Sequence, residues 1–136
     1  MPRNRAFYLT VMSAALILAT ITPKAYPTTT PHFKPSEFTC PCCHELRLDP
    51  QLLVMLEKLR AELGDEPITI TSGYRCPKHN QMIGGAKRSQ HMLGRAADIK
   101  AKHYTPAEVG HFARMLGFGY VKVYKTWTHV DVRRTE

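Results

Sequence analysis

The sequence is short of several residue types, and each shortage excludes a class of protein. Acidic side chains number 11 against 19 lysines and arginines, so the 136-residue chain has a formal net charge of +8 and suits an anionic partner. Aromatic residues make up only 9%, and they are not interleaved with basic residues in the stripe typical of nucleic-acid binding. No repeat, coiled-coil pattern, phosphate-binding loop or Ser/His/Asp order is present. We therefore expect no nucleic-acid partner.

The N-terminal segment has no acidic residue. Its uncharged, mostly apolar run over residues 6–21 follows Arg3 and Arg5; it is short for a transmembrane helix but fits a signal peptide. We expect residues 1–25 to be a signal peptide, with an uncleaved membrane anchor as the alternative because Pro23 makes a poor site for cleavage after Ala25. Either one predicts an exported protein that is periplasmic, extracellular or anchored at the inner membrane. A Pro/Thr-rich linker over residues 26–31 follows.

Cysteine is scarce, and three of the four residues are crowded together. Cys40, Cys42 and Cys43 precede His44, and Cys76 lies far along the chain. An even number of cysteines behind an export signal favours at least one disulfide, and we expect Cys76 to pair with one of the three. The alternative is a zinc site formed by Cys40, Cys42 or Cys43, His44 and Cys76. The run C-x-C-C-H, taken as a whole, lacks the usual C-x-x-C spacing, so the disulfide is the first expectation.

The residue pattern predicts a single α+β domain over residues 32–136, which can fold alone at this length. Two segments combine helix-start residues with apolar residues at helical spacing and a following glycine: 50–63 and 106–116. Three segments alternate apolar and polar residues as half-buried strands do: 67–71, 119–124 and 126–133. Strands and helices do not alternate strictly, so we expect a small antiparallel sheet backed by the two helices rather than a parallel sheet.

The stretch richest in chemistry runs from residue 72 to residue 99. His91 and Asp98 are seven residues apart, and an odd separation places side chains on opposite faces of a regular strand. His91 must therefore lie in the loop before a strand or across a bend, with Gly94 as the pivot, while Asp98 lies inside the strand. In the last predicted strand, His129 and Asp131 share one face. Two imidazoles and a carboxylate can bind a catalytic zinc and leave its fourth position for water.

The sequence around these residues resembles one family. The matching motifs are Ser-Gly-Tyr-Arg at 72–75, His-Asn at 79–80, Gly-Gly at 84–85, Ser-x-His-x-x-Gly-x-Ala-x-Asp-Ile at 89–99 and His-Val-Asp at 129–131. From about Phe33 to Arg133 the chain resembles the M15 family of zinc peptidases, in particular its small periplasmic and phage-borne members. The resemblance implies one zinc ion bound by His91, Asp98 and His129. It also implies a D-Ala-D-Ala carboxypeptidase or an endopeptidase that acts as a monomer on peptidoglycan, whose negative charge suits a basic domain.

The resemblance also implies roles for residues beside the zinc. Arg75 would hold a carboxylate or carbonyl of the substrate, and Ser89 would contact the substrate. Many M15 members carry the catalytic base three residues before the last zinc histidine, where this chain has Thr126. Asp131 is our substitute candidate for the base, and the alternative is that Asp131 orients a zinc-binding imidazole.

Thr126 also keeps a different class of function open. The chain could be a catalytically inactive, zinc-containing domain that binds the cell wall or a partner. A redox or metal-handling protein built on the cysteine cluster is a third hypothesis, and it would require reactive thiols.

Overall fold

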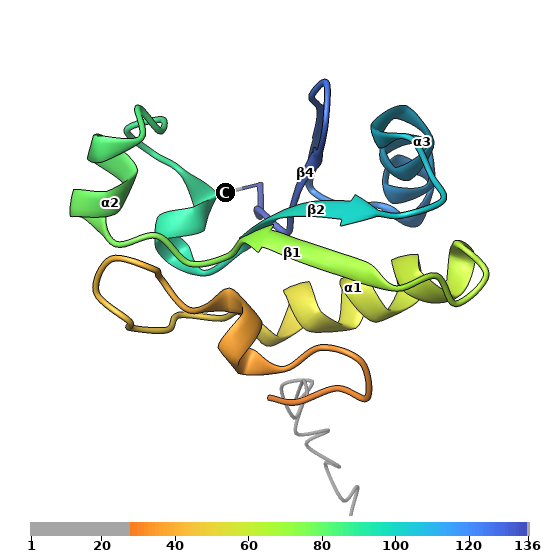
Figure 1. The fold of residues 1–136 in the computed structure, drawn as a ribbon, viewed down its shortest axis with the longest axis horizontal. Coiled ribbons are helices and arrows are strands. Elements are labelled where there is room, and N and C mark those ends of the chain that lie inside the picture. Colours follow the sequence, from red (N-terminus) through yellow and green to blue (C-terminus); the bar gives the residue numbers. More distant parts are fainter. Residues whose placement is uncertain (1–27, 136) are drawn as a thin grey trace, which may run out of the picture.

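The computed structural model describes residues 28–135, so the predicted signal or anchor segment lies outside the described residues. The sheet is antiparallel throughout, in the order β1-β2-β4-β3. Figure 1 shows β1 and β2 side by side. Its strands are β1 (Ile68–Ser72), β2 (Ala96–Ala101), β3 (Tyr120–Val123) and β4 (Thr128–Asp131). The expected α+β fold with a small antiparallel sheet is confirmed. None of the described helices is both long and apolar enough to cross a membrane.

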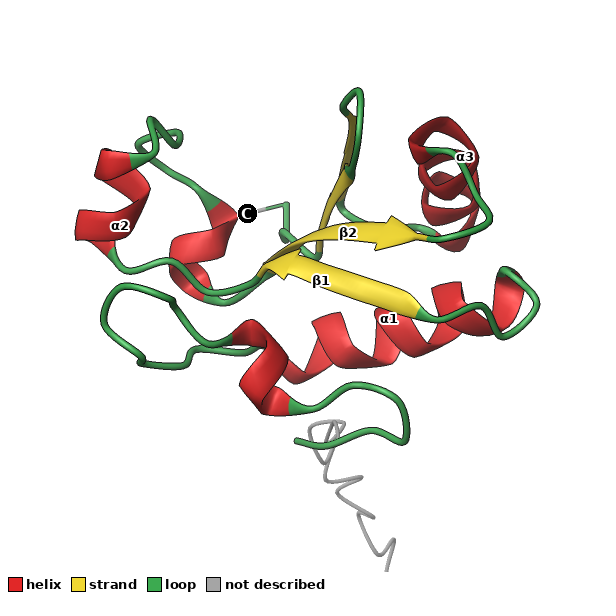
Figure 2. Cartoon of the chain, in the orientation of Figure 1, coloured by secondary structure: helices red, strands yellow, loops and turns green. Residues whose placement is uncertain are grey.

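The two long helices begin and end close to where the sequence predicts. The helices are α1 (Pro50–Glu62), α2 (Pro77–Met82) and α3 (Pro106–Leu116), with short 3-10 helices η1 (Pro35–Phe38) and η2 (Gln90–Leu93) (Figure 2). Asp49 caps α1 by accepting a hydrogen bond from the backbone N–H of Gln51 at 2.9 Å. Thr105 and Glu108 form a capping box at the start of α3.

One face of the sheet packs on the core, and this decides where the polar side chains point. Ala97 and Ile99 of β2 and Val130 of β4 are fully buried in a single cluster with the apolar faces of α1 and α3. Successive side chains of a strand point to opposite faces, so Asp98 and His129 face away from this core. They are also direct neighbours in the β2–β4 pairing. The hydrophobic alternation that builds the core thus places both polar side chains together on the opposite face.

The expected disulfide is a wrong prediction. All four cysteines are free thiols. The sulfur atoms of Cys40, Cys43 and Cys76 gather around a common point, within 4.8 Å of one another, and no two are bonded.

Candidate metal centre

Three potential metal ligands converge on the side of the sheet that faces away from the hydrophobic core. His91 Nε2 lies 3.2 Å from Asp98 Oδ1 and 3.2 Å from His129 Nδ1. The third separation, between His129 Nδ1 and Asp98 Oδ1, is 3.0 Å. Ligands at 2.0–2.2 Å from a tetrahedral zinc are separated by roughly 3.3–3.6 Å, so a small outward shift of the three donors would admit the ion. The triad predicted from the sequence is therefore brought together by the fold.

His91 is held from behind by the loop that follows β1. Its Nδ1–H donates to the carbonyl oxygen of Gly73 at 2.7 Å, which leaves Nε2 unprotonated and directed at Asp98. The chain turns from η2 into β2 at Gly94, whose φ of +68° lies in the left-handed region. A Cβ atom at Gly94 would lie 2.3 Å from the carbonyl oxygen of Arg47, so this turn also requires the absence of a side chain. Gly94 is the pivot that the sequence predicts.

His129 is oriented by Asp131, two residues further along β4. His129 Nε2–H donates to Asp131 Oδ2 at 3.1 Å, which leaves Nδ1 free to face Asp98. Arg133 in turn donates to Asp131 from its backbone N–H at 3.1 Å and from its guanidinium. The Asp131 side chain is completely buried and both of its oxygens are engaged. This is the carboxylate–histidine arrangement that fixes the tautomer of a metal-binding imidazole.

Arg75 and Ser89 both lie at the site and contact the triad directly. Arg75 donates to the second oxygen of Asp98 at 2.7 Å and to Ser72 Oγ at 2.9 Å. Asp98 is thus bound on one oxygen by a guanidinium and presents the other to the two histidines. Ser89 caps η2, and its Oγ accepts a hydrogen bond from the backbone N–H of His91 at 3.3 Å.

The charges of the site support one another. Burial would raise the pKa of Asp98, but its hydrogen bonds with His129 and His91 outweigh burial and hold this pKa well below its usual range. Burial would lower the pKa of His129, and the hydrogen bonds to Asp131 and Asp98 raise it instead. Burial would likewise raise the pKa of Asp131, which His129 and Arg133 lower. Both carboxylates are therefore ionised at neutral pH, as a cation site requires.

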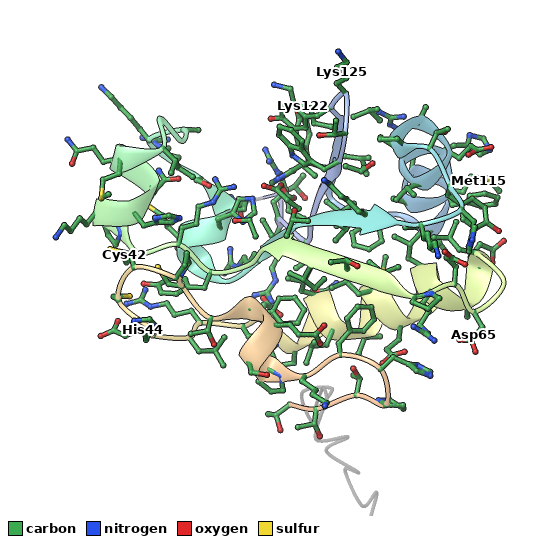
Figure 3. The ribbon with its side chains drawn as sticks, viewed as in Figure 1. Cys42, His44, Asp65, Met115, Lys122 and Lys125 are labelled. Carbon is green, nitrogen blue, oxygen red and sulfur yellow. The ribbon has the colours of Figure 1, made fainter. Side chains whose placement is uncertain are left out.

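The triad lies in a cleft of about 760 Å³ that is strongly basic. Arg88, Lys122 and Arg133 line the cleft together with Arg75, and Asp98 is the only acid among the described residues that line it. Lys122 projects from the β3–β4 hairpin in Figure 3. One wall is aromatic, because the rings of Tyr124 and Trp127 stack 4.5 Å apart. The cleft combines a metal-binding floor with a positively charged rim.

His79, His103, His111 and Thr126 do not line the cleft that holds the triad. His103 interacts with Glu66, and His79 and His111 belong to α2 and α3. Thr126 lines a separate small cavity beside α3 rather than the cleft.

Sequence reasoning missed three residues of this site. Ser72 holds Arg75, Gly73 holds His91, and Arg133 holds Asp131. The first two belong to the Ser-Gly-Tyr-Arg motif, and Arg133 shares the strand alternation of His129 and Asp131. These patterns could have indicated all three.

A cleft whose floor presents two imidazoles and a carboxylate is typical of zinc hydrolases, which keep one metal position open. The family model of Peptidase M15 matches residues 31–131. The chain therefore belongs to the M15 peptidase family.

Two known proteins are similar to this chain. The zinc D-Ala-D-Ala carboxypeptidase of Streptomyces albus G is 40% identical over 63 residues, which are 46% of this chain. The match spans only 25% of that protein's length. The L-Ala D-Glu endopeptidase ChiX of Serratia marcescens superposes with a TM-score of 0.44 and 19% identity, over 63% of this chain and 80% of that one.

Proposed function

We propose that this chain is a zinc-dependent peptidase that hydrolyses peptide bonds in peptidoglycan stem peptides or cross-links. The observation that carries the proposal is the convergence of His91, Asp98 and His129 at donor separations of 3.0–3.2 Å on the floor of an open cleft. Membership of the M15 peptidase family and the partial match to a zinc D-Ala-D-Ala carboxypeptidase support it.

In this proposal the triad holds the zinc ion, and Arg75 and Ser89 position the ligands and the substrate. A zinc ion held by the triad would polarise the scissile carbonyl and lower the pKa of a bound water. Arg75 orients Asp98 through its hydrogen bond to Oδ2, and its position in the cleft allows it to contact a substrate oxygen as well. Ser89 holds the backbone of His91 and faces the same cleft, where it can contact the substrate.

Asp131 acts in this proposal by orienting His129 rather than as the base. A base must come within hydrogen-bond reach of the reacting water. Asp131 is completely buried, is bound to His129 and Arg133, and does not line the cleft. These contacts favour the orienting role between the two that the sequence leaves open.

The basic rim supports an anionic peptide as the substrate. Arg88, Lys122 and Arg133 surround the triad, and the only acid that lines the cleft is itself a proposed ligand. Stem peptides carry free carboxylates, which guanidinium and ammonium groups bind through charge-assisted hydrogen bonds. The peptide would therefore be drawn to the cleft by its carboxylates, and the scissile bond would be placed over the triad.

One observation favours a second function, a zinc-containing domain that binds the wall without cutting it. The cleft is lined by no carboxylate apart from Asp98 in the described chain, and Thr126 points elsewhere. A site without an acid to accept the water's proton could retain binding and lose turnover.

Product analysis distinguishes the two functions. Purified peptidoglycan is incubated with the wild-type protein, with His91→Ala and with the control His111→Ala, which alters a histidine of α3 outside the cleft. Mass spectrometry of the products should show hydrolysis by the wild type and by the control, loss with His91→Ala or a chelator, and recovery on adding zinc. The released fragment then identifies the bond: free D-Ala, an opened cross-link, or a cut between L-Ala and D-Glu. Zinc-dependent retention on insoluble peptidoglycan without products would instead establish the binding domain.

We further propose that the chain acts as a monomer outside the cytoplasm. The basic start and the uncharged apolar run over residues 6–21 support export, either with cleavage or with a membrane tether. Fractionation of producing cells and light scattering of the purified protein test both points.

A further inference from the structure

The four cysteines form a cluster that the triad does not use. The sulfurs of Cys40, Cys43 and Cys76 lie within 4.8 Å of one another. Cys42 lies outside this group of three but packs against the buried cluster that contains Cys40 and Cys76. Thiolates bound to zinc at about 2.3 Å are separated by roughly 3.8 Å, which matches a gathering of this size. Three such sulfurs with no bond between any two, and a fourth cysteine beside them, fit the ligand set of a structural zinc site.

The spacing of these cysteines also fits such a site. Cys40 and Cys43 are separated by two residues, which is the C-x-x-C spacing of structural zinc sites. The interpretation of the segment as C-x-C-C-H overlooked this pair because Cys42 interrupts it. Cys76 supplies a third sulfur from the loop that follows β1.

Backbone N–H groups point at the sulfur atoms, as they do where a thiolate is stabilised. The N–H of Cys76 donates to Cys40 Sγ at 3.4 Å. Cys76 Sγ accepts from the N–H of His79 at 3.4 Å, where it caps α2. Hydrogen bonds from these N–H groups would support bound thiolates.

The segment that carries three of the cysteines has little else to hold it. Residues 39–49 form no helix or strand. Cys40 and Cys76 belong to a small buried cluster with Tyr74, separate from the main core. The loop closes tightly through hydrogen bonds between residues 40, 44 and 45, and His44 has a left-handed φ of 60°. In Figure 3 the loop that carries Cys42 lies beneath α2. A metal ion bound across this loop would supply the stabilisation that apolar packing does not.

We propose that Cys40, Cys43 and Cys76, with Cys42 as the fourth ligand, bind a structural zinc ion separate from the triad. The ion cross-links the N-terminal loop to the residue that directly follows Arg75. Because Arg75 holds Asp98 at 2.7 Å, the thiolate site acts as a positioning device for the triad. Closed four-coordinate thiolate sites of this kind contribute to folding rather than to chemistry.

Counting metal ions tests the proposal in the full-length protein, purified with zinc and without an oxidant. The wild type should carry two zinc ions per chain. His91→Ala should keep one, and X-ray absorption of that variant should show zinc–sulfur distances near 2.3 Å. Cys43→Ser and Cys76→Ser should each lose the thiolate-bound ion. The matched control is His44→Ala, which alters the same loop at an exposed side chain and should keep both ions.

Several results would overturn the proposal. His91→Ala protein that contains no zinc, or whose zinc has only nitrogen and oxygen neighbours, excludes a thiolate site without relying on any cysteine variant. An intact mass of the unreduced wild type that lacks two or four thiol hydrogens would establish disulfides instead. Loss of an ion from His44→Ala would exclude Cys42 as the fourth ligand. Thiols that react fully with an alkylating reagent before zinc is chelated would also contradict the site.

Discussion

Asp131 accepts a hydrogen bond from Nε2 of His129 at 3.1 Å while being shielded completely from solvent. This pair determines which nitrogen of His129 faces the cleft: Nε2 carries the proton for Asp131, so Nδ1 is left for a metal. The carboxylate also adds basicity to the imidazole. The proposed metal centre therefore includes a carboxylate that does not line the cleft.

Asp131→Asn should weaken zinc binding at the triad by about 10- to 100-fold, because an amide orients His129 less firmly. Activity should return when zinc is raised, as measured by hydrolysis in zinc-buffered solutions. Asp65→Asn is the matched control, since Asp65 is an exposed carboxylate that does not line the cleft, and it should behave as the wild type. If Asp131→Asn binds zinc normally but stays inactive at saturating zinc, Asp131 is the base after all.

Gly94→Ala should lower the free energy of unfolding by more than the cost of placing an alanine at a left-handed φ. A left-handed non-glycine residue costs about 1–3 kcal/mol, and Gly117→Ala at the end of α3 should cost this amount because nothing lies within 4 Å of its missing Cβ. Gly94→Ala also forces a contact 2.3 Å from the Arg47 carbonyl oxygen. Urea unfolding of both zinc-free variants gives the comparison. Equal losses for the two variants would mean that the neighbouring loop gives way freely.

The zinc that supports activity should be released as the pH falls. Burial lowers the pKa of His129, but the hydrogen bonds to Asp131 and Asp98 outweigh burial, so the pKa of His129 is raised overall. Protons therefore compete with the metal for His129 at a higher pH than they would for an ordinary histidine. Asp98 has a lowered pKa and does not contribute there. The apparent zinc affinity should therefore be constant at high pH and fall about tenfold per pH unit below the pKa of His129. Chelator competition with activity as the readout measures it, and an affinity that stays flat down to pH 5 would contradict the assignment.

Much of this site could be predicted from the sequence, because its signals are local. The period-two alternation of β4 places His129 and Asp131 on one face, and Gly94 marks the bend that brings His91 beside Asp98. The cap at Asp49 fixes the start of α1 in the same way.

The remaining features depend on contacts between distant segments. Which oxygen of Asp98 faces Arg75 depends on the loop after β1, and the burial of Asp131 depends on Arg133 folding back onto it. The sequence favours a disulfide because the chain is expected to be exported and has an even number of cysteines. The convergence of three sulfurs on one point appears only when the N-terminal loop packs against the Cys76 loop.

The most direct test of the metal centre is anomalous diffraction at the zinc edge from crystals of the wild-type protein. We predict a peak in the cleft, 2.0–2.2 Å from His91 Nε2, Asp98 Oδ1 and His129 Nδ1, with a water in the fourth position. A cleft without anomalous density in crystals grown with zinc, or an ion bound through His129 Nε2, would contradict the account.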